Sequence, residues 1–181
     1  MSGEAPPLGK PTPDAPAGVG VEVLPATREQ EPVLANLLEL YSHDFSEFVE
    51  LELHPDGRFG YPWLPLYWTE ENRWPFLIQV DGALAGFVFV TRGLPPSGDP
   101  AVYDMAEFFI VRGQRKLGIG TAAARLVWQR FPGRWQVRVI ESNQPALAFW
   151  RSAIAAFAGP AVQESSLWLS DRHWHVFSFH G

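Results

Sequence analysis

The sequence predicts one domain of mixed α/β or α+β class, in which a sheet is flanked by helices. Its 181 residues, 46% of them hydrophobic and 19% charged, suit a single soluble globular domain with its own core. Apolar residues either run together in short segments or recur every three to four positions. The resulting order is strand, helices, three strands, helix, strand, helix and two strands, which favours a sheet covered by helices.

The first 18 residues are expected to form a disordered tail, which leaves residues 19–181 as the single domain. Five prolines among Gly, Ala and Ser prevent a helix interior in the tail and bring little apolar surface. The domain then opens with a strand at residues 19–24, where apolar side chains dominate.

A first helix is predicted from apolar residues at helical spacing between Val33 and Tyr41. Thr27 and Gln30 have the spacing of a capping box, which would start the helix at Thr27. Pro32 would then lie inside the helix, and it favours a start nearer to itself. Both starts stay open at this point.

A second helix, a loop and a hairpin are predicted to follow. Residues 43–54 are expected to continue as the second helix, and residues 55–75 combine Pro, Gly and many aromatic residues, which is typical of a loop. Two β-rich runs then meet at Asp81-Gly82, a pair that favours a two-residue hairpin turn. The remaining predicted elements are a strand at 103–111, a helix within 118–131, a strand at 135–140, a helix at 146–157 and a closing hairpin of 161–169 and 174–179.

Composition excludes several classes of function. No cysteine occurs, which removes disulfides, Cys-ligated metal centres and thiol nucleophiles. No apolar run reaches the roughly 18 residues of a membrane span, and no signal pattern opens the sequence, so we expect a cytoplasmic protein without a membrane partner. The net charge of −6 gives no general support for nucleic-acid binding.

An uneven distribution of charge marks a candidate anion site. Residues 112–134 carry a charge of +6 and no Asp or Glu, whereas the remainder carries −12. Within this stretch, Arg115-Lys116-Leu117-Gly118-Ile119-Gly120 lies where a strand ends and a helix begins. The start of a helix presents unpaired N–H groups, and glycines let a phosphate approach the backbone closely. A pyrophosphate would fit there, although two glycines alone are also typical of an ordinary turn. The P-loop ending and the three-glycine dinucleotide fingerprint are both missing.

With its arginine and two glycines, this segment matches the pattern Arg/Gln-x-x-Gly-x-Gly/Ala and resembles the acyl-CoA site of the GCN5-related N-acetyltransferases. A second signature, Asn143-x-x-Ala146 directly after a predicted strand, resembles the segment with which that family reaches the pantetheine arm. The resemblance covers residues 76–158 well and the last hairpin loosely. The amino-acid sequence of this region is similar to that of a group of bacterial predicted acetyltransferases.

The resemblance implies an α/β (α+β) fold with a mixed, mostly antiparallel sheet of about seven strands, and acetyl-CoA as cosubstrate. It implies that the turn holds the pyrophosphate and that the strand before it pairs with the pantetheine arm. Trp150 stands where many members carry a tyrosine that protonates the leaving thiolate, and an indole N–H is not acidic enough to replace it. The implied cofactor-binding residues are Phe108, Phe109, Ile110, Arg115, Lys116, Leu117, Gly118, Ile119, Gly120, Thr121, Asn143, Phe149 and Trp150.

Asp104 and Glu107 are the candidates for a catalytic base, because family members often place a carboxylate on this strand. Residues three apart in a regular strand point to opposite faces. Because the family has a bulge in this strand, this alternation cannot decide which of the two acids faces the thioester. We favour Glu107, since it lies directly ahead of the pantetheine-pairing segment, and a structural glutamate is the alternative. Backbone N–H groups near Phe108 and Phe109 would meet the oxyanion, and CoA can leave as a thiolate without a dedicated acid.

His173 and His175 alternate along one strand, a spacing that suggests a metal ion. No third ligand is evident nearby in the sequence, so we interpret them as edge-strand histidines and expect no metal. Aromatic residues near the long loop either frame an acceptor cavity or cover the core, and packing is favoured for most of them. These residues are Tyr61, Trp63, Tyr67, Trp68 and Trp74.

The function predicted from these patterns is an acetyl-CoA-dependent N-acetyltransferase that acts on a primary amine of a small molecule or a protein. Two alternatives remain open: a CoA-binding regulatory module without catalysis, and an aromatic-rich domain that binds sugars or peptides. The acidic remainder of the chain mildly favours a cationic acceptor, but negative charge also serves solubility. The identity of the acceptor and the oligomeric state, a homodimer included, stay open.

Overall fold

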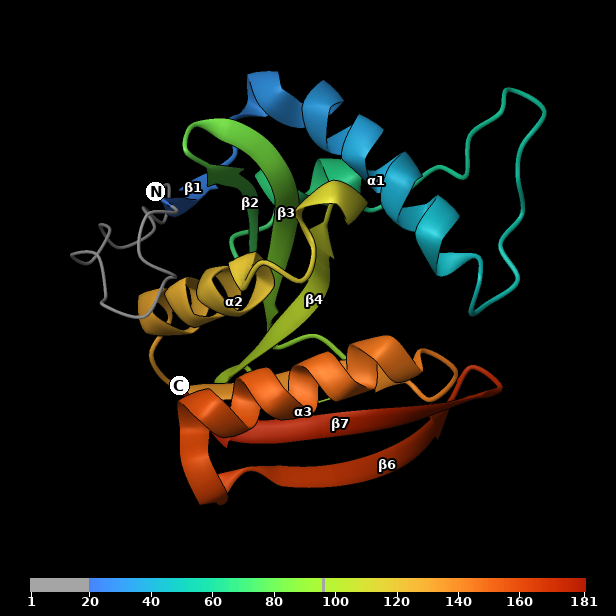
Figure 1. Cartoon of the computed structure of the whole chain (residues 1–181). Coiled ribbons are helices and arrows are strands. Elements are labelled where there is room, and N and C mark those ends of the chain that lie inside the picture. The colour runs from blue at the N-terminus through green and yellow to red at the C-terminus, as the bar shows by residue number, and fades with distance from the viewer. Residues whose placement is uncertain (1–19, 96) are drawn as a thin grey trace.

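The computed structural model describes residues 20–95 and 97–181, and the predicted Pro-rich tail lies outside them (Figure 1). The described residues contain one seven-stranded sheet with the strand order β1-β2-β3-β4-β5-β7-β6. Neighbouring strands are antiparallel except for β4 and β5, which are parallel. The predicted mixed, mostly antiparallel sheet is confirmed. Its strands are β1 (Val21–Pro25), β2 (Arg73–Val80), β3 (Ala83–Arg92), β4 (Val102–Ile110), β5 (Arg134–Ile140), β6 (Gln163–Leu169) and β7 (Arg172–His180).

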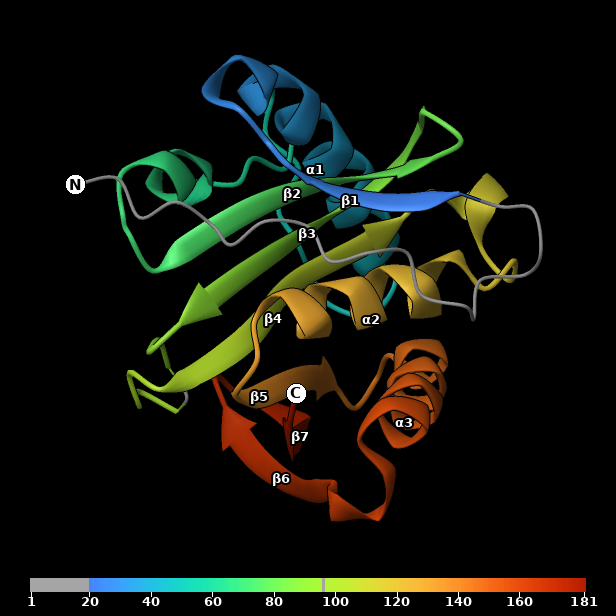
Figure 2. The same cartoon turned by 90° about the vertical axis from the view of Figure 1, so that its left-hand side faces the viewer.

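Helices cover both faces of the sheet (Figures 1 and 2). Helix α1 (Glu31–Phe45) packs its buried leucines on one face, together with the short 3₁₀ helix η2 (Leu64–Trp68). Helices α2 (Ile119–Arg130) and α3 (Gln144–Ala158) pack on the other face around Trp128 and Phe177. The core therefore has two layers separated by the sheet. Three further 3₁₀ turns are η1 (Arg28–Gln30), η3 (Arg112–Gln114) and η4 (Gly159–Ala161).

Two local signals act as the sequence predicts. Thr27 and Gln30 do form a capping box, which heads η1, and α1 follows from Glu31 with Pro32 in its first turn. The start predicted at Thr27 is therefore that of the 3₁₀ helix η1, and the start predicted near Pro32 is that of the α-helix α1. The hairpin turn at Asp81-Gly82 has φ values of 49° and 79°, the left-handed pair that a two-residue turn of this kind requires.

The second helix predicted at residues 43–54 is wrong. Helix α1 ends at Phe45, and turns carry the chain to Val49, which is buried. Beyond Val49 no apolar stripe meets the sheet, and Leu53 is 58% exposed. A helix there would bury no face, and helices in proteins depend on such burial for most of their stability.

Strand β4 contains a bulge and then separates from its neighbour β5. Opposite β3, Phe89 pairs with Glu107 and Val90 pairs with Met105, so Ala106 is the extra residue of the bulge. Strands β4 and β5 pair only over the first three residues of each, up to Asp104 on β4. The second half of β4 therefore has a backbone edge that β5 does not occupy.

Of the helices in the described ranges, none is long and apolar enough to cross a bilayer.

Candidate active site

A cavity of about 610 Å³ opens beside the second half of β4. Its walls come from the end of α1, the turn before α2 and the start of α3. Leu117 and Ile119 do not line it: Leu117 is 55% exposed, and Ile119, the first residue of α2, is buried in the core. The predicted cofactor-binding residues that do line the cavity are Phe108, Phe109, Ile110, Arg115, Lys116, Gly118, Gly120, Thr121, Asn143, Phe149 and Trp150.

The turn before α2 presents the backbone of a helix start to this cavity. Gly118 is the N-cap with a φ of 77°, and Lys116 also has a positive φ, of 65°. The first helical bond runs from the N–H of Ala122 to the carbonyl of Gly118, so the N–H groups of residues 119–121 precede the hydrogen-bonded ladder. At Gly120, a Cβ would lie 3.2 Å from the Phe149 ring. Gly118 thus permits the left-handed backbone of the turn, and Gly120 permits the close packing of α2 against Phe149 of α3.

Arg115 fastens this turn to the rest of the site. Its Nε donates to the carbonyl of Ile110 at 2.7 Å, and its guanidinium pairs with Asp44 of α1 at 2.6 Å and lies over the Phe109 ring. Arg112 pairs with the same carboxylate at 2.9 Å. Both arginines are therefore occupied, and Lys116 is the basic side chain of the motif without an ion pair among the described residues.

The start of α3 forms the opposite wall. The Asn143 Oδ1 accepts the N–H of Ala146 at 3.1 Å and caps the helix, which leaves the side-chain amide nitrogen for a ligand. Trp150 is 7% exposed and packs edge-on against Phe108 and Phe149. At the position of the family's tyrosine, the chain therefore offers an apolar wall to the cavity.

Glu107 is held by two tyrosine hydroxyls from distant segments. Tyr41 of α1 donates to Oε2 at 2.5 Å, and Tyr61 of the long loop donates to Oε1 at 3.0 Å. Burial raises the pKa of the Glu107 carboxyl, while the two hydrogen bonds and the charge of Arg138 oppose the rise. Burial and the Glu107 charge also raise the pKa of Tyr41, so its hydroxyl stays protonated. Among the described residues, Tyr41 lines the cavity and Glu107 lies behind it.

Asp104 is committed to an ion pair. It is 1% exposed, and its Oδ2 accepts from the Arg138 guanidinium at 2.5 Å. Burial raises the pKa of the Asp104 carboxyl, and the charge of Arg138 opposes that rise. Asp104 also repels the Glu107 charge, and Arg138 attracts both. In a regular strand, Asp104 and Glu107 would point to opposite faces of the sheet. The extra residue at Ala106 shifts the alternation by one position, so both acids lie on the same face.

The sequence reasoning missed the roles of Tyr41, Asp44 and Arg138. In the sequence, Tyr41 belongs to an apolar helix stripe, and no spacing links it to Glu107, 66 residues away. Most of the aromatic residues near the long loop pack as favoured: Tyr67 is buried, and Tyr61, Trp68 and Trp74 are partly buried against the core. Trp63 is 54% exposed, and none of these residues lines the cavity. His173 and His175 lie on β7, among residues that do not line the cavity.

Comparison with known proteins gives a consistent result. The sequence matches the model of the acetyltransferase (GNAT) family over residues 34–153. No curated protein sequence gives a significant match. An acetyltransferase from Thermus thermophilus has a TM-score of 0.67 at 15% identity, over 89% of this chain and 97% of that one. The aminoglycoside acetyltransferase AAC(6')-Ib, in complex with ribostamycin and coenzyme A, has a TM-score of 0.66 at 17% identity, over 88% and 93%.

A third structure is that of RimL, a ribosomal L7/L12 alpha-N-protein acetyltransferase in complex with coenzyme A. It has a TM-score of 0.63 at 11% identity, over 92% of this chain and 97% of that one. At these identities the structures establish a shared fold. The family model spans most of the chain and includes the turn, the bulged strand and the start of α3. The chain therefore belongs to the GNAT family and is an acetyltransferase.

Proposed function

We propose that this enzyme moves the acetyl group of acetyl-CoA to a primary amine of a small molecule or a protein by direct attack on the thioester. The observation that carries the proposal is the enclosure of Glu107 by Tyr41 and Tyr61, with Tyr41 exposed to the cavity. An amine must lose a proton as it becomes an amide, and a carboxylate with a raised pKa is a suitable final acceptor.

Acetyl-CoA would bind along the free edge of β4 and across the turn. The N–H groups of residues 119–121 and the side chain of Lys116 suit the pyrophosphate, and the Asn143 amide suits the pantetheine arm. Several solved relatives of this fold hold coenzyme A, which supports the same cosubstrate here. The unpaired backbone N–H groups near Phe108 and Phe109 would stabilise the oxyanion.

The proton would travel through Tyr41. As the amine nitrogen bonds to the thioester carbon, the Tyr41 oxygen accepts the proton of the amine and passes its own hydroxyl proton to Glu107. The tetrahedral intermediate then collapses, the C–S bond breaks, and CoA leaves as a thiolate. Water can protonate that thiolate, because thiols have pKa values near ~8.5, so Trp150 needs no acidic role. The proton on Glu107 then returns through Tyr41 to the hydroxide left in solvent, which restores the carboxylate.

The acceptor is proposed to be a cationic amine. Glu47 lines the cavity and has no side-chain partner among the described residues, which leaves its carboxylate free for a positively charged group. Among the structural relatives, AAC(6')-Ib is an aminoglycoside acetyltransferase, and RimL is a ribosomal L7/L12 alpha-N-protein acetyltransferase. An amine panel for this protein should therefore hold aminoglycosides, small polyamines and peptides with free N-termini.

Replacing Glu107 by Gln tests the proposal. The variant keeps the size of the side chain but removes the base, so the rate should fall by about 10² to 10⁴ while acetyl-CoA affinity persists. The loss should shrink at high pH, where solvent supplies free amine. Glu71→Gln is the matched control, because that glutamate is exposed and does not line the cavity. We would measure CoA release by thiol titration and affinity by calorimetry.

Two outcomes would contradict the proposal. Acetyl-CoA binding without turnover on any amine of the panel would favour a regulatory CoA-binding module. An unchanged pH–rate profile in Glu107→Gln, together with a lower melting temperature, would make Glu107 a structural residue. Asp104→Asn provides a further comparison, since loss of rate there with retention in Glu107→Gln would assign the base to Asp104.

A further inference from the structure

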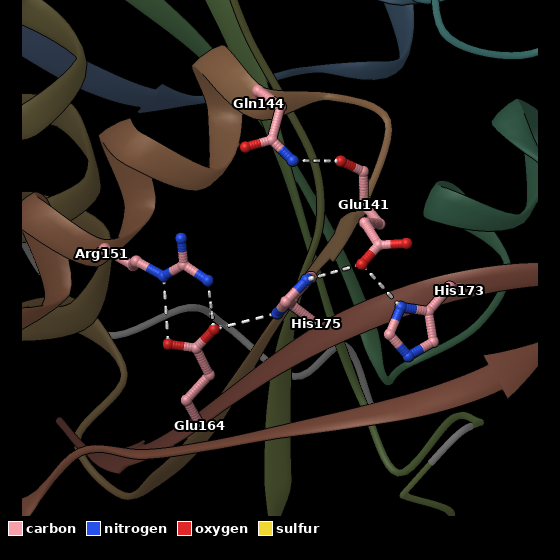
Figure 3. A network of polar contacts seen from close by, with 6 residues as sticks. All are labelled: Glu141, Gln144, Arg151, Glu164, His173 and His175. Carbon is pink, nitrogen blue, oxygen red and sulfur yellow. Dashed lines mark hydrogen bonds and ion pairs between the residues drawn. The ribbon is translucent and has the colours of Figure 1, made fainter.

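A cluster of histidine and glutamate side chains lies at the end of β5 and the start of β7, apart from the proposed acetyl-transfer residues (Figure 3). His173 and His175 point from β7 toward the carboxylate of Glu141, which directly follows β5. The Glu141 Oε1 lies 3.1 Å from His173 Nδ1 and 3.8 Å from His175 Nε2. One potential ligand atom from each residue lies within 4.8 Å of the others. Glu141 is thus a third potential ligand, which the sequence alone did not reveal.

The spacing of these atoms suits a small metal ion. A tetrahedral zinc ion with bonds of about 2.0 to 2.1 Å separates its ligand atoms by about 3.3 Å. The separations of 3.1 and 3.8 Å lie on either side of that value. Small rotations of side chains that are 18%, 33% and 54% exposed would bring all three atoms to an ion.

A second carboxylate orients one of the histidines. The His175 Nδ1 donates to Glu164 Oε1 at 2.9 Å, and Arg151 of α3 holds Glu164 through two further hydrogen bonds. In a neutral His175 imidazole, this contact places the hydrogen on Nδ1 and leaves the lone pair of Nε2 toward Glu141. Metal-binding histidines very often donate their other ring N–H to a carboxylate in this way. An ordinary surface ion pair does not need that arrangement.

The backbone also fixes Glu141. Its N–H donates to the carbonyl of His173 at 3.0 Å, and its own carbonyl accepts from the Gln144 side chain at 2.8 Å. The ladder between β5 and β7 pairs Val139 with His175, so the three candidate ligands lie on adjacent positions of two bonded strands. The ligands are therefore held in place before any ion binds, which lowers the entropic cost of binding.

We propose that Glu141, His173 and His175 form a binding site for one divalent transition-metal ion, with Zn²⁺ as the best match. Two imidazoles and one carboxylate suit zinc better than magnesium or calcium, which prefer oxygen ligands. A fourth position stays open to water. The ion would tie β7 to the turn that carries Asn143, two residues after Glu141, into the acetyl-CoA cavity.

Titration of the full chain with Zn²⁺ tests the site. After dialysis against a chelator, the protein should bind one equivalent of Zn²⁺ at about pH 7.5 by calorimetry. Co²⁺ should give the visible absorption bands of a low-symmetry, imidazole-ligated ion. His173→Ala, His175→Ala and Glu141→Gln should each abolish the one-equivalent binding, and Glu164→Gln should weaken it by about 10- to 100-fold.

His180→Ala is the matched control, because His180 is exposed on the same strand but distant in register from the cluster. It should bind zinc as the wild type does. Absence of one-equivalent binding in the wild type would overturn the proposal and leave a network of ion pairs. Equal losses in His180→Ala and His173→Ala would also overturn it, since binding would then be non-specific. Circular dichroism of each metal-free variant separates loss of the site from loss of the fold.

Discussion

The turn before α2 and the enclosure around Glu107 are built in different ways. The turn takes its shape from residues 112–121, whose positive charges, left-handed positions and free N–H groups are all local. The enclosure joins Tyr41 and Tyr61 to Glu107, which lies 66 and 46 residues away from them along the chain. A backbone site can be specified by a short run of consecutive residues, whereas a side-chain site of this kind exists only after α1, the loop and β4 have packed.

The two regions also differ in their electrostatics. The turn lines an open cavity and carries Arg112, Arg115 and Lys116, so we expect it to attract an anion. The enclosure excludes water from a carboxylate, and burial therefore raises its pKa. Binding of the cosubstrate should depend on the first region, and proton transfer on the second. Substitutions placed in one region at a time should separate these two dependences.

The largest effect is expected from Gly118→Asp in the turn. A side chain at φ 77° costs about 1 to 2 kcal/mol of stability. The negative charge of the new side chain opposes a nearby pyrophosphate by about 1 to 4 kcal/mol, so acetyl-CoA affinity should fall roughly 100-fold. Calorimetry measures the change. Gly113→Asp is the control, because that glycine has open space around it and an ordinary φ. Equal affinity in wild type and Gly118→Asp would show that the pyrophosphate binds elsewhere.

Tyr41→Phe should act on the other region alone. It removes the hydroxyl between the cavity and Glu107, so kcat should fall about 10-fold or more while acetyl-CoA affinity stays unchanged. Tyr61→Phe removes an equivalent hydrogen bond away from the cavity wall and should reduce kcat less. Steady-state kinetics with one accepted amine gives both values. If the two variants lose rate equally, the hydroxyls only orient Glu107 and Tyr41 carries no proton.

Asp44→Asn should weaken the attachment of the turn to α1, the helix that also carries Tyr41. Asp44 pairs with both Arg112 and Arg115, and exposed pairs contribute about 0.2 to 1 kcal/mol each. We expect a melting temperature lower by a few degrees and acetyl-CoA affinity reduced a few-fold, because the turn loses its attachment to α1. Glu31→Gln breaks a single exposed pair with Arg28 and should change neither quantity measurably. A salt titration that abolishes the difference would support the electrostatic origin.

The smallest effect concerns the pH dependence of stability. Because the pKa of Glu107 is higher in the folded protein than in the unfolded chain, the folded state binds the proton more tightly. The contribution of this carboxyl is favourable below its ordinary pKa of 4.5 and is lost as the pH rises through the folded value. Glu107→Gln should therefore gain stability relative to the wild type as the pH rises above the ordinary pKa of 4.5. Urea unfolding at several pH values measures the difference, and a constant difference would contradict the raised pKa.

Several features could be predicted from the sequence because their physical causes are local. The Asp81-Gly82 turn and the capping box of Thr27 and Gln30 need only neighbouring residues. The motif from Arg115 to Gly120 indicates a helix start that can hold an anion, for the same reason. The helix predicted at residues 43–54 failed because helix formation there needed a surface to cover, and the sequence does not show where the sheet ends.

The sequence by itself determined the fold class, the element order apart from the second helix, the glycine-containing start of α2 and the pair of candidate acids. Only the tertiary structure decided the difference between those acids, because the bulge at Ala106 turns both to one face and packing then gives Asp104 to Arg138 and Glu107 to two tyrosines. The same holds for Glu141, which meets His173 and His175 through strand pairing. Local backbone preferences act within a few residues, whereas the environment of a side chain depends on which distant segments pack around it.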